Sequence, residues 1–418
     1  MAKYIITGGN RLEGSIRVPG AKNSVLPILA AALLTDEQSV IRDCPNLVDI
    51  EKAVGILRAV GCKVKIEGGT IIVDPSNITT HIIPDEYVKE IRSSIIFLGA
   101  MVARAGKARV TYPGGCEIGQ RPINLHLKGL EDLGVNIEES YGYIECKESK
   151  LTGADIHLDY PSVGATENII MAATAAHGYT IIRNAAKEPE ITDLQDFINA
   201  MGGCVAGAGT STIMVEGRRP LRGADHTIIP DRIVAGTYLG AAAITGGEIM
   251  VENVVFDHVQ PIIAKLRETG AVIRASGSAV HIKSKDRPFP VYKTTTLPHP
   301  GFPTDMQAPL VSILTVARGT SVVVETIFEN RFKHVPELMR MGADIRIDGK
   351  TAVIQGVEKL RGAEVLSWDL RGGAALVLAG LRAEGQTVID DIHHIERGYE
   401  RLEHSLRSIG AQIDKVED

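Results

Sequence analysis

One pattern recurs six times along the 418 residues: an amphipathic helical stretch ends in a glycine, and a short alternating strand follows. Successive glycines of this pattern are 73, 68, 68, 72 and 68 residues apart, and they are Gly61, Gly134, Gly202, Gly270, Gly342 and Gly410. Glycine closes a helix because the residue after the last turn often adopts a left-handed conformation, which glycine reaches without steric cost. The repeat predicts six copies of one structural unit.

Each copy also contains a second helix that is apolar on nearly all faces. These helices are predicted over residues 23–33, 88–103, 165–176, 231–244, 305–317 and 372–381. A helix without a polar face has to be surrounded by protein. Short β-type runs such as TSVVVETIF (320–328) and QTVIDDI (386–392) separate the two kinds of helix. The expected fold class is therefore α/β, built from a strand, a buried helix, a strand, an amphipathic helix and a strand pair.

Six units of this size are more than one hydrophobic core accommodates, which favours a division into domains. Three units plus three is the natural division, and we place the break near residue 230, before the fourth buried helix. One continuous array of six units is the alternative.

Polar groups stand at the start of every buried helix, where free N–H groups and the helix dipole favour anions. They are Lys22-Asn23, Arg92, Ser162-Val163-Gly164, Asp231-Arg232, Thr304-Asp305 and Asp369-Leu370-Arg371. If the repeats share one geometry and the two domains face each other, these groups would meet in a cleft. Helix capping is the alternative for Ser, Asp and Asn, but it does not explain the basic residues, which oppose the dipole.

A single cysteine lies in the glycine-rich stretch TYPGGCEIGQRPINLH, residues 111–126. Cys116 has Gly114 and Gly115 on one side and Gly119 on the other, and Arg121 follows five residues later. A thiol in such a polar setting beside a guanidinium is placed for reactivity. An inert, packed cysteine is the alternative.

Composition excludes several classes of protein. The net charge is -6 and only 4% of residues are aromatic, so binding of nucleic acid by bulk charge or by base stacking is not expected. The five cysteines show no CxxC spacing, which argues against a zinc site and a disulfide framework. No apolar signal core and no run of 18 apolar residues occurs, so we expect a cytoplasmic chain without a membrane partner.

A series of long motifs follows one order along the chain: PGAKNSVLPILAA, PGGCEIGQRPINLH, SVGAT, PDR, GFPTDMQA, FENRF, DLRGGAALVLAGL and IERGYE. Together they resemble those of the UDP-N-acetylglucosamine 1-carboxyvinyltransferases, enolpyruvyl transferases of the EPSP synthase-like superfamily. The resemblance extends from Gly9 to Gly410. It implies a two-domain inside-out α/β barrel in which each domain has three βαβαββ repeats with buried helices. It also implies a domain of residues 20–229 that carries the cysteine loop, and a second domain of residues 1–19 and 230–418.

The resemblance implies transfer of the enolpyruvyl group of phosphoenolpyruvate to the 3-hydroxyl of UDP-N-acetylglucosamine, without cofactor or metal. It casts Cys116 as the proton donor and the target of the antibiotic fosfomycin, and Asp305 as the proton acceptor. Lys22, Arg121 and Arg397 match the residues that hold phosphoenolpyruvate, and Asn23, Asp369 and Arg371 match a second ring around the intermediate. The matches for the nucleotide sugar are Arg92, Arg121, Pro122, Ile123, Asn124, Leu125, Ser162, Val163, Gly164, Ile327 and Arg331.

One position departs from the family, because Asn124 stands where many members have aspartate, and this puts a carboxylate contact there in doubt. Two other functions compete with the implied one. EPSP synthase shares the fold and the donor, but the cysteine loop and SVGAT argue against it. A non-catalytic sensor of UDP-sugars is the second, and the retention of Cys116, Asp305 and Arg397 argues against it. His393-His394 has no third ligand at a suitable spacing for a metal.

Overall fold

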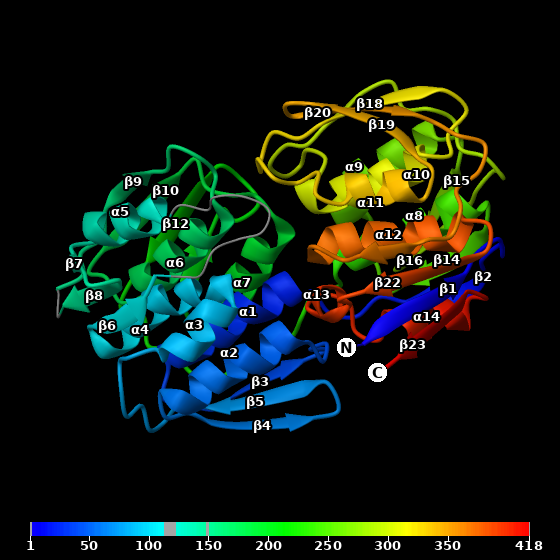
Figure 1. Cartoon of the computed structure of the whole chain (residues 1–418). Coiled ribbons are helices and arrows are strands. Elements are labelled where there is room, and N and C mark those ends of the chain that lie inside the picture. Colours follow the sequence, from blue (N-terminus) through cyan, green and yellow to red (C-terminus); the bar gives the residue numbers. More distant parts are fainter. Residues whose placement is uncertain (1, 113–122, 148–149, 418) are drawn as a thin grey trace. The chain divides into compact units, whose positions relative to one another are not determined.

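Apolar helices form the interior of two compact units. The computed structural model describes residues 2–112, 123–147 and 150–417, apart from the side chains of Lys89 and Arg92. The described residues from Gly20 to Ile229 make the N-terminal unit, and those up to Pro19 and from Pro230 onward make the C-terminal unit (Figure 1). Each unit has its own cluster of buried hydrophobic side chains.

The N-terminal unit repeats one order of elements three times. The first copy comprises α1 (Lys22–Ala31), the 3-10 turn η1 (Ala32–Leu34), β3 (Ser39–Arg42), α2 (Val48–Ala59), β4 (Lys63–Glu67) and β5 (Thr70–Asp74). The second comprises α3 (Asp85–Glu90), η2 (Arg92–Ile96), α4 (Phe97–Ala105), β6 (Ala108–Thr111), α5 (Asn124–Asp132), β7 (Asn136–Ser140) and β8 (Tyr143–Lys147). The third comprises β9 (Asp155–His157), α6 (Val163–Ala173), β10 (Tyr179–Arg183), α7 (Pro189–Ala200), β11 (Cys204–Ala206) and β12 (Thr212–Glu216), and β13 (Asp225–Thr227) follows it.

The C-terminal unit has the same order of elements. Its first copy comprises α8 (Arg232–Thr245), β14 (Glu248–Glu252), α9 (Phe256–Glu268), β15 (Val272–Ser276) and β16 (Ala279–Lys283). The next comprises β17 (Thr294–Thr295), η3 (Thr304–Met306), α10 (Gln307–Leu314), β18 (Thr320–Val324), α11 (Val335–Arg340), β19 (Asp344–Asp348) and β20 (Thr351–Gln355). The last comprises β21 (Glu364–Leu366), α12 (Leu370–Arg382), β22 (Gln386–Asp390), α13 (His393–Glu396), α14 (Leu402–Ser408) and β23 (Gln412–Val416).

Among the described residues, the four-stranded sheets share one pairing pattern. In the order β13-β3-β5-β4, for example, β4 and β5 form an antiparallel hairpin, β5 pairs antiparallel with β3, and β13 joins β3 in parallel. In the last sheet, β21-β22-β1-β23, β1 (Lys3–Thr7) occupies the position that β5 has in the sheet above, and it pairs antiparallel with both β22 and β23. In the same unit β2 (Glu13–Arg17) joins β14 in parallel. The N-terminal strands therefore complete two sheets of the C-terminal unit.

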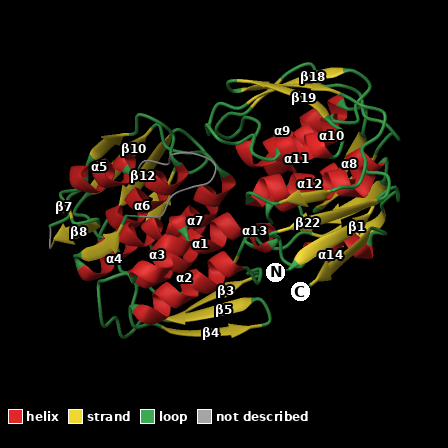
Figure 2. Cartoon of the chain, viewed as in Figure 1, coloured by secondary structure: helices red, strands yellow, loops and turns green. Residues whose placement is uncertain are grey.

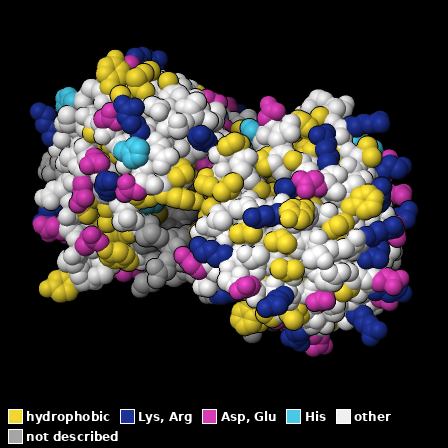
Figure 3. All heavy atoms as spheres, turned by 90° about the horizontal axis from the view of Figure 1, so that it is seen from above, with side chains coloured by type: hydrophobic (Ala, Val, Ile, Leu, Met, Phe, Trp, Pro, Cys, Tyr) yellow, Lys and Arg dark blue, Asp and Glu magenta, His cyan; other side chains and the backbone are white. Residues whose placement is uncertain are grey.

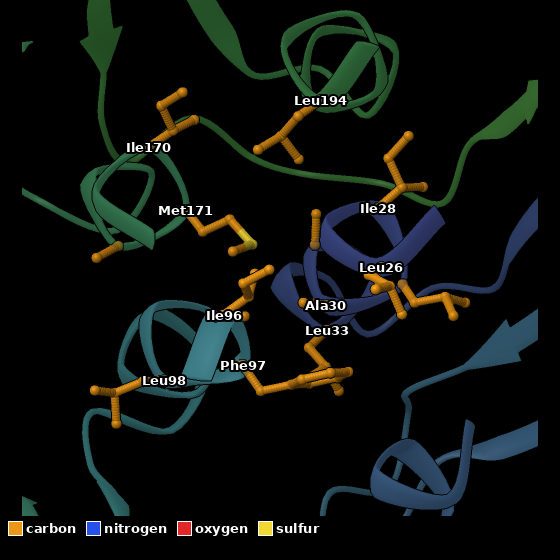
Figure 4. Packing of buried hydrophobic residues seen from close by; sticks show 14 of the residues in the cluster. Leu26, Ile28, Ala30, Leu33, Ile96, Phe97, Leu98, Ile170, Met171 and Leu194 are labelled. Atoms are coloured by element: carbon orange, nitrogen blue, oxygen red, sulfur yellow. The ribbon is translucent and has the colours of Figure 1, made fainter. Parts of the chain in front are cut away.

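Strands lie around helices in each unit, as Figure 2 shows. In the N-terminal unit α4 contacts both α1 and α6, and Figure 4 shows side chains such as Ala30, Phe97 and Met171 between these helices. The close approach of α4 to α6 requires a glycine, because a Cβ at Gly99 would lie 2.3 Å from the carbonyl oxygen of Asn168. These helices are therefore inside and the sheets outside, as the family resemblance implied.

Two local predictions have clear outcomes. The six repeat glycines all adopt left-handed conformations, with φ between 90° and 116°, so their predicted role at helix ends is confirmed. The helix predicted over 88–103 is wrong as one element. Ile91 is extended (φ -121°, ψ 116°), so α3 ends before it and a new turn starts at Arg92.

On the face drawn in Figure 3, basic and acidic side chains are interspersed with hydrophobic ones. Among the described residues, the helices are too short or too polar to cross a membrane.

Candidate active site

The polar groups predicted at the buried helices do lie at their first turns. The elements concerned start at Lys22, Arg92, Val163, Arg232, Thr304 and Leu370. Three of these helices are capped by the side chain of the residue before them, which accepts hydrogen bonds from backbone N–H groups of the first turn. Ser162 accepts from Ala165, Asp231 from Ile233 and Val234, and Asp369 from Arg371 and Gly372. Capping, the alternative reading, is thus part of what these three side chains do.

In the C-terminal unit two arginines donate hydrogen bonds to the carboxylate of Asp305. Its Oδ1 accepts a hydrogen bond from Arg331 Nη2 at 2.5 Å, and its Oδ2 accepts two from Arg371, from Nη2 at 2.9 Å and Nε at 3.2 Å. The side chains of Arg331 and Arg371 are only 3% and 4% exposed, whereas that of Asp305 is 26% exposed. Two buried cations therefore hold the Asp305 carboxylate, and part of its side chain remains exposed to solvent.

The charge of the arginine at the start of α12 is stabilised by its neighbours. Burial of the Arg371 guanidinium disfavours its charged form, but the negative charge of Asp305 and the nearby Tyr399 and Asp231 outweigh that cost and raise its pKa above the usual value. Its Cζ also lies 5.4 Å from the ring centre of Tyr399. The helix start that lacked a structural reason in the sequence thus carries a partner for Asp305.

A second pair of polar groups lies next to this cluster without full hydrogen bonding. Asp369 Oδ1 caps α12 at 2.9 Å from the N–H groups of both Arg371 and Gly372, while its Oδ2 is enclosed. His334 is 1% exposed, and among the described residues neither ring nitrogen has a partner in hydrogen-bonding geometry. Burial lowers the pKa of His334 to about 4, and the negative charge of Asp369 offsets this only in part.

Because His334 is buried in its neutral form, the free energy of unfolding should decrease at acid pH. Between about pH 6.5 and pH 4 the unfolded chain binds a proton at His334 that the folded chain does not, so acidification through this window favours unfolding. We expect His334→Phe to lose about 3 kcal/mol less stability than the wild type over that window, measured by urea unfolding at both pH values. His393→Phe, at an exposed position, is the control and should lose as much as the wild type. Equal acid losses in all three proteins would contradict the assignment.

Two further predicted residues lie in turns of the C-terminal unit. Ile327 follows β18 by three residues, and its N–H donates to Oε1 of the buried Glu325 at 2.7 Å. Arg397 follows α13 directly, is half-buried, and lies two residues before Tyr399. Because Tyr399 lies beside Arg371, the Arg397 turn is adjacent to the cluster around Asp305.

In the N-terminal unit the lysine at the start of α1 is held by a neighbouring helix. Lys22 Nζ lies 3.1 Å from Oδ2 of Asp49 in α2, and both side chains are buried. Asn23, the next residue, is exposed. Asp49 compensates the unfavourable position of a cation at a helix N-terminus, and it was missed in the sequence because it belongs to an ordinary amphipathic helix.

In the N-terminal unit, the buried side-chain amide of Asn168 connects helices that carry predicted nucleotide-sugar residues. Asn168 Nδ2 donates to Ile95 O in η2 at 2.9 Å and lies 2.7 Å from His126 Nδ1 in α5, and Asn168 Oδ1 accepts from Gly99 N in α4. A Cβ at Gly164 would lie 2.9 Å from Cε1 of the same His126 ring. Asn168 lies in α6, which follows Ser162 and includes Val163 and Gly164, and it therefore connects this helix to η2, which begins at Arg92, and to α5, which follows Ile123 and begins with Asn124 and Leu125.

Several predicted residues lie outside the described part of the chain. These are Cys116, Arg121 and Pro122, and the side chain of Arg92 is also not described although its backbone starts η2. The two adjacent histidines, His393 and His394, stack with ring centres 3.9 Å apart. Within the described ranges no group of three or more His, Cys, Asp or Glu side chains is placed to hold a metal ion.

The sequence profile of the EPSP synthase (3-phosphoshikimate 1-carboxyvinyltransferase) family matches residues 6–406. UDP-N-acetylglucosamine 1-carboxyvinyltransferase 2 of Caldanaerobacter subterraneus subsp. tengcongensis is 56% identical over 416 residues, which cover 100% of each chain. The chain belongs to the UDP-N-acetylglucosamine 1-carboxyvinyltransferase family. A second family member, from Symbiobacterium thermophilum, is 51% identical and covers 99% of this chain and 95% of its own.

Solved structures agree with the family fold. The enolpyruvyl transferase NikO from Streptomyces tendae superimposes with a TM-score of 0.89 at 26% identity, covering 99% of each chain. EPSP synthase from Acinetobacter baumannii superimposes with a TM-score of 0.78 at 18% identity and shows the fold alone. The two-domain, inside-out α/β architecture that the resemblance implied is thus confirmed.

For a 1-carboxyvinyltransferase of this family, the residues that the sequence did not single out are those that hold the predicted ones. They are Asp49, His126, Asn168 and Glu325. Each is a polar side chain in an otherwise ordinary helix or turn. Only a polar residue at a position expected to be apolar, such as Glu325 after the run SVVV, could have drawn attention to one of them.

Proposed function

We propose that this chain transfers the enolpyruvyl group of phosphoenolpyruvate to the 3-hydroxyl of UDP-N-acetylglucosamine and releases phosphate, the first committed step of peptidoglycan synthesis. We further propose that it acts in the cytoplasm on these two substrates without a cofactor. The family membership supports this activity, since relatives at 50% identity or more over nearly the full length carry the corresponding name.

The proposed reaction is an addition followed by an elimination. The sugar oxygen forms a bond to C2 of phosphoenolpyruvate while its proton passes to Asp305, and Cys116 gives a proton to the methylene carbon. The product of this step is a tetrahedral intermediate. Loss of a proton from the new methyl group and departure of phosphate then restore the double bond, so that no oxidant or further reactant is needed.

The geometry of Asp305 is the observation that carries this proposal. Both of its oxygens bind a buried guanidinium, Oδ1 through one hydrogen bond and Oδ2 through two, and the side chain is 26% exposed. The two positive charges favour the ionised carboxylate, which is the form that accepts a proton.

The remaining predicted residues would bind the substrates. We propose that Lys22, Arg121 and Arg397 bind the carboxylate and phosphate of phosphoenolpyruvate, because arginine forks and a lysine point charge suit these anions. Asn23, Asp369 and Arg371 would surround the intermediate. The segments joined by Asn168, together with Ile327 and Arg331, would bind the nucleotide sugar.

One assay tests the proposal and separates it from its competitors. We expect the purified protein to release phosphate only when phosphoenolpyruvate and UDP-N-acetylglucosamine are both present. Release with shikimate 3-phosphate in place of the nucleotide sugar would identify an EPSP synthase. A nucleotide-sugar sensor would be stabilised by UDP-N-acetylglucosamine in thermal unfolding and yet release no phosphate.

A further inference from the structure

We infer that Glu325 is a positioning residue for this reaction: its buried carboxylate joins the turn that carries Asp305 to the turn that carries Ile327. It would thereby keep the proton acceptor in register with the bound nucleotide sugar. The inference rests on the proposed function, because it gives a purpose to residues whose roles are proposed there.

Four hydrogen bonds converge on this one carboxylate from three parts of the chain. Oε1 accepts from Thr296 Oγ1 at 2.8 Å and from the N–H groups of Ile327 at 2.7 Å and Phe328 at 3.2 Å. Oε2 accepts from Thr304 Oγ1 at 2.8 Å. Glu325 is therefore the common partner of the 296, 304 and 327 turns.

The connection continues from Thr304 to the proposed proton acceptor. Arg331 Nε and Nη2 each lie 3.4 Å from the Thr304 carbonyl oxygen, and the same Nη2 donates to Asp305 Oδ1. One end of this chain of contacts is thus Glu325 and the other is Asp305. A shift of the 304 turn would move Asp305 relative to Arg331 and to Ile327 together.

Glu325 is too deeply buried to contact a substrate, so its influence on the reaction would pass through these neighbours. The residue is 1% exposed, so its side chain is closed off from solvent by the chain around it. Burying a carboxylate is costly unless hydrogen bonds compensate, and here they come from both turns. An apolar residue after the run SVVV would continue the core without that cost, which is why the position calls for an explanation beyond stability.

The conservative variant separates position from charge. In Glu325→Gln the amide oxygen can keep the three bonds made to Oε1, and the amide NH₂ can donate to Thr304, whose hydroxyl rotates to accept. Glu325→Ala removes all four bonds. Glu325→Gln is therefore expected to preserve the geometry and Glu325→Ala to release both turns.

The test is steady-state kinetics of the full chain for both substrates, with the pH profile of kcat. We expect Glu325→Gln to keep kcat within about threefold. We expect Glu325→Ala to lower kcat and raise the KM for UDP-N-acetylglucosamine by about tenfold or more each, with a smaller change in the KM for phosphoenolpyruvate. The acid limb of the kcat profile should move in Glu325→Ala and stay in place in Glu325→Gln, since it reports the proton acceptor.

Two further variants keep the result interpretable. Ile354 is a buried residue of β20, which pairs with β18, and it lies away from both turns. Ile354→Ala creates a cavity there and should lower thermal stability without changing the kinetics at temperatures where the protein is folded. If Glu325→Ala does not fold, Thr304→Val removes only the bond to Oε2 and should reproduce part of the kinetic loss. Wild-type kinetics in folded Glu325→Ala, or a Glu325→Gln enzyme as impaired as Glu325→Ala, would overturn the inference. Neither result affects the proposed function, which fails only if the wild type shows no two-substrate phosphate release.

Discussion

Asp305→Asn is expected to lower turnover by about 10²- to 10⁴-fold, the range typical of the loss of a general base. Asparagine keeps the shape of the side chain and one acceptor oxygen, but its amide does not take up a proton at neutral pH. One of the two guanidinium contacts also loses its acceptor, because the amide NH₂ would face Arg331 or Arg371. Stopped assays of phosphate release with both substrates would measure the loss.

Binding serves as the control for this variant. UDP-N-acetylglucosamine should still raise the thermal unfolding temperature of Asp305→Asn, because this substitution leaves the proposed nucleotide-sugar residues of the N-terminal unit unchanged. Arg397→Ala should show the opposite pattern, with weaker phosphoenolpyruvate binding. An Asp305→Asn protein with wild-type turnover would remove Asp305 from its proposed role.

Cys116 is expected to tolerate replacement by another acid and not by an alcohol. As a proton donor it would be replaced functionally by Cys116→Asp, but with the pH optimum moved to the acid side, because a carboxyl group of pKa about 3.9 holds its proton only at low pH. Cys116→Ser should be far less active, since a serine hydroxyl is a very poor acid. Profiles of kcat against pH for the three proteins measure this difference.

Alkylation adds an independent readout for the thiol. The resemblance implies that fosfomycin modifies Cys116, so the wild type should be inactivated irreversibly and Cys116→Asp should escape. If the Asp and Ser variants were equally inactive at every pH, the sulfur would have a role that a carboxyl group does not fill. The donor assignment would then fall, whereas the fold and the substrates would stand.

In the candidate site, the sequence predicted where polar residues stand on the helices but not which residues they contact. The positions of Lys22, Thr304-Asp305 and Asp369-Arg371 at helix starts followed from hydrophobic periodicity, because that pattern is local. What each residue binds did not follow. Arg371 meets Asp305, which is 66 residues away, and Lys22 meets Asp49 on the next helix. Only the folded chain brings such pairs together.

The sequence by itself determined the number of repeats, the glycine-closed helix ends and the burial of the apolar helices. These properties depend on backbone conformation and on periodicity within a few turns, so they can be read from neighbouring residues. Tertiary structure decided where the helix predicted over 88–103 breaks, which strands β1 pairs with, and how Asn168 and Glu325 each connect distant segments. The physical reason is that a buried polar group must find its partners wherever the packed chain supplies them. These partners include Thr296, which is 29 residues from Glu325, and Ile95, which is 73 residues from Asn168.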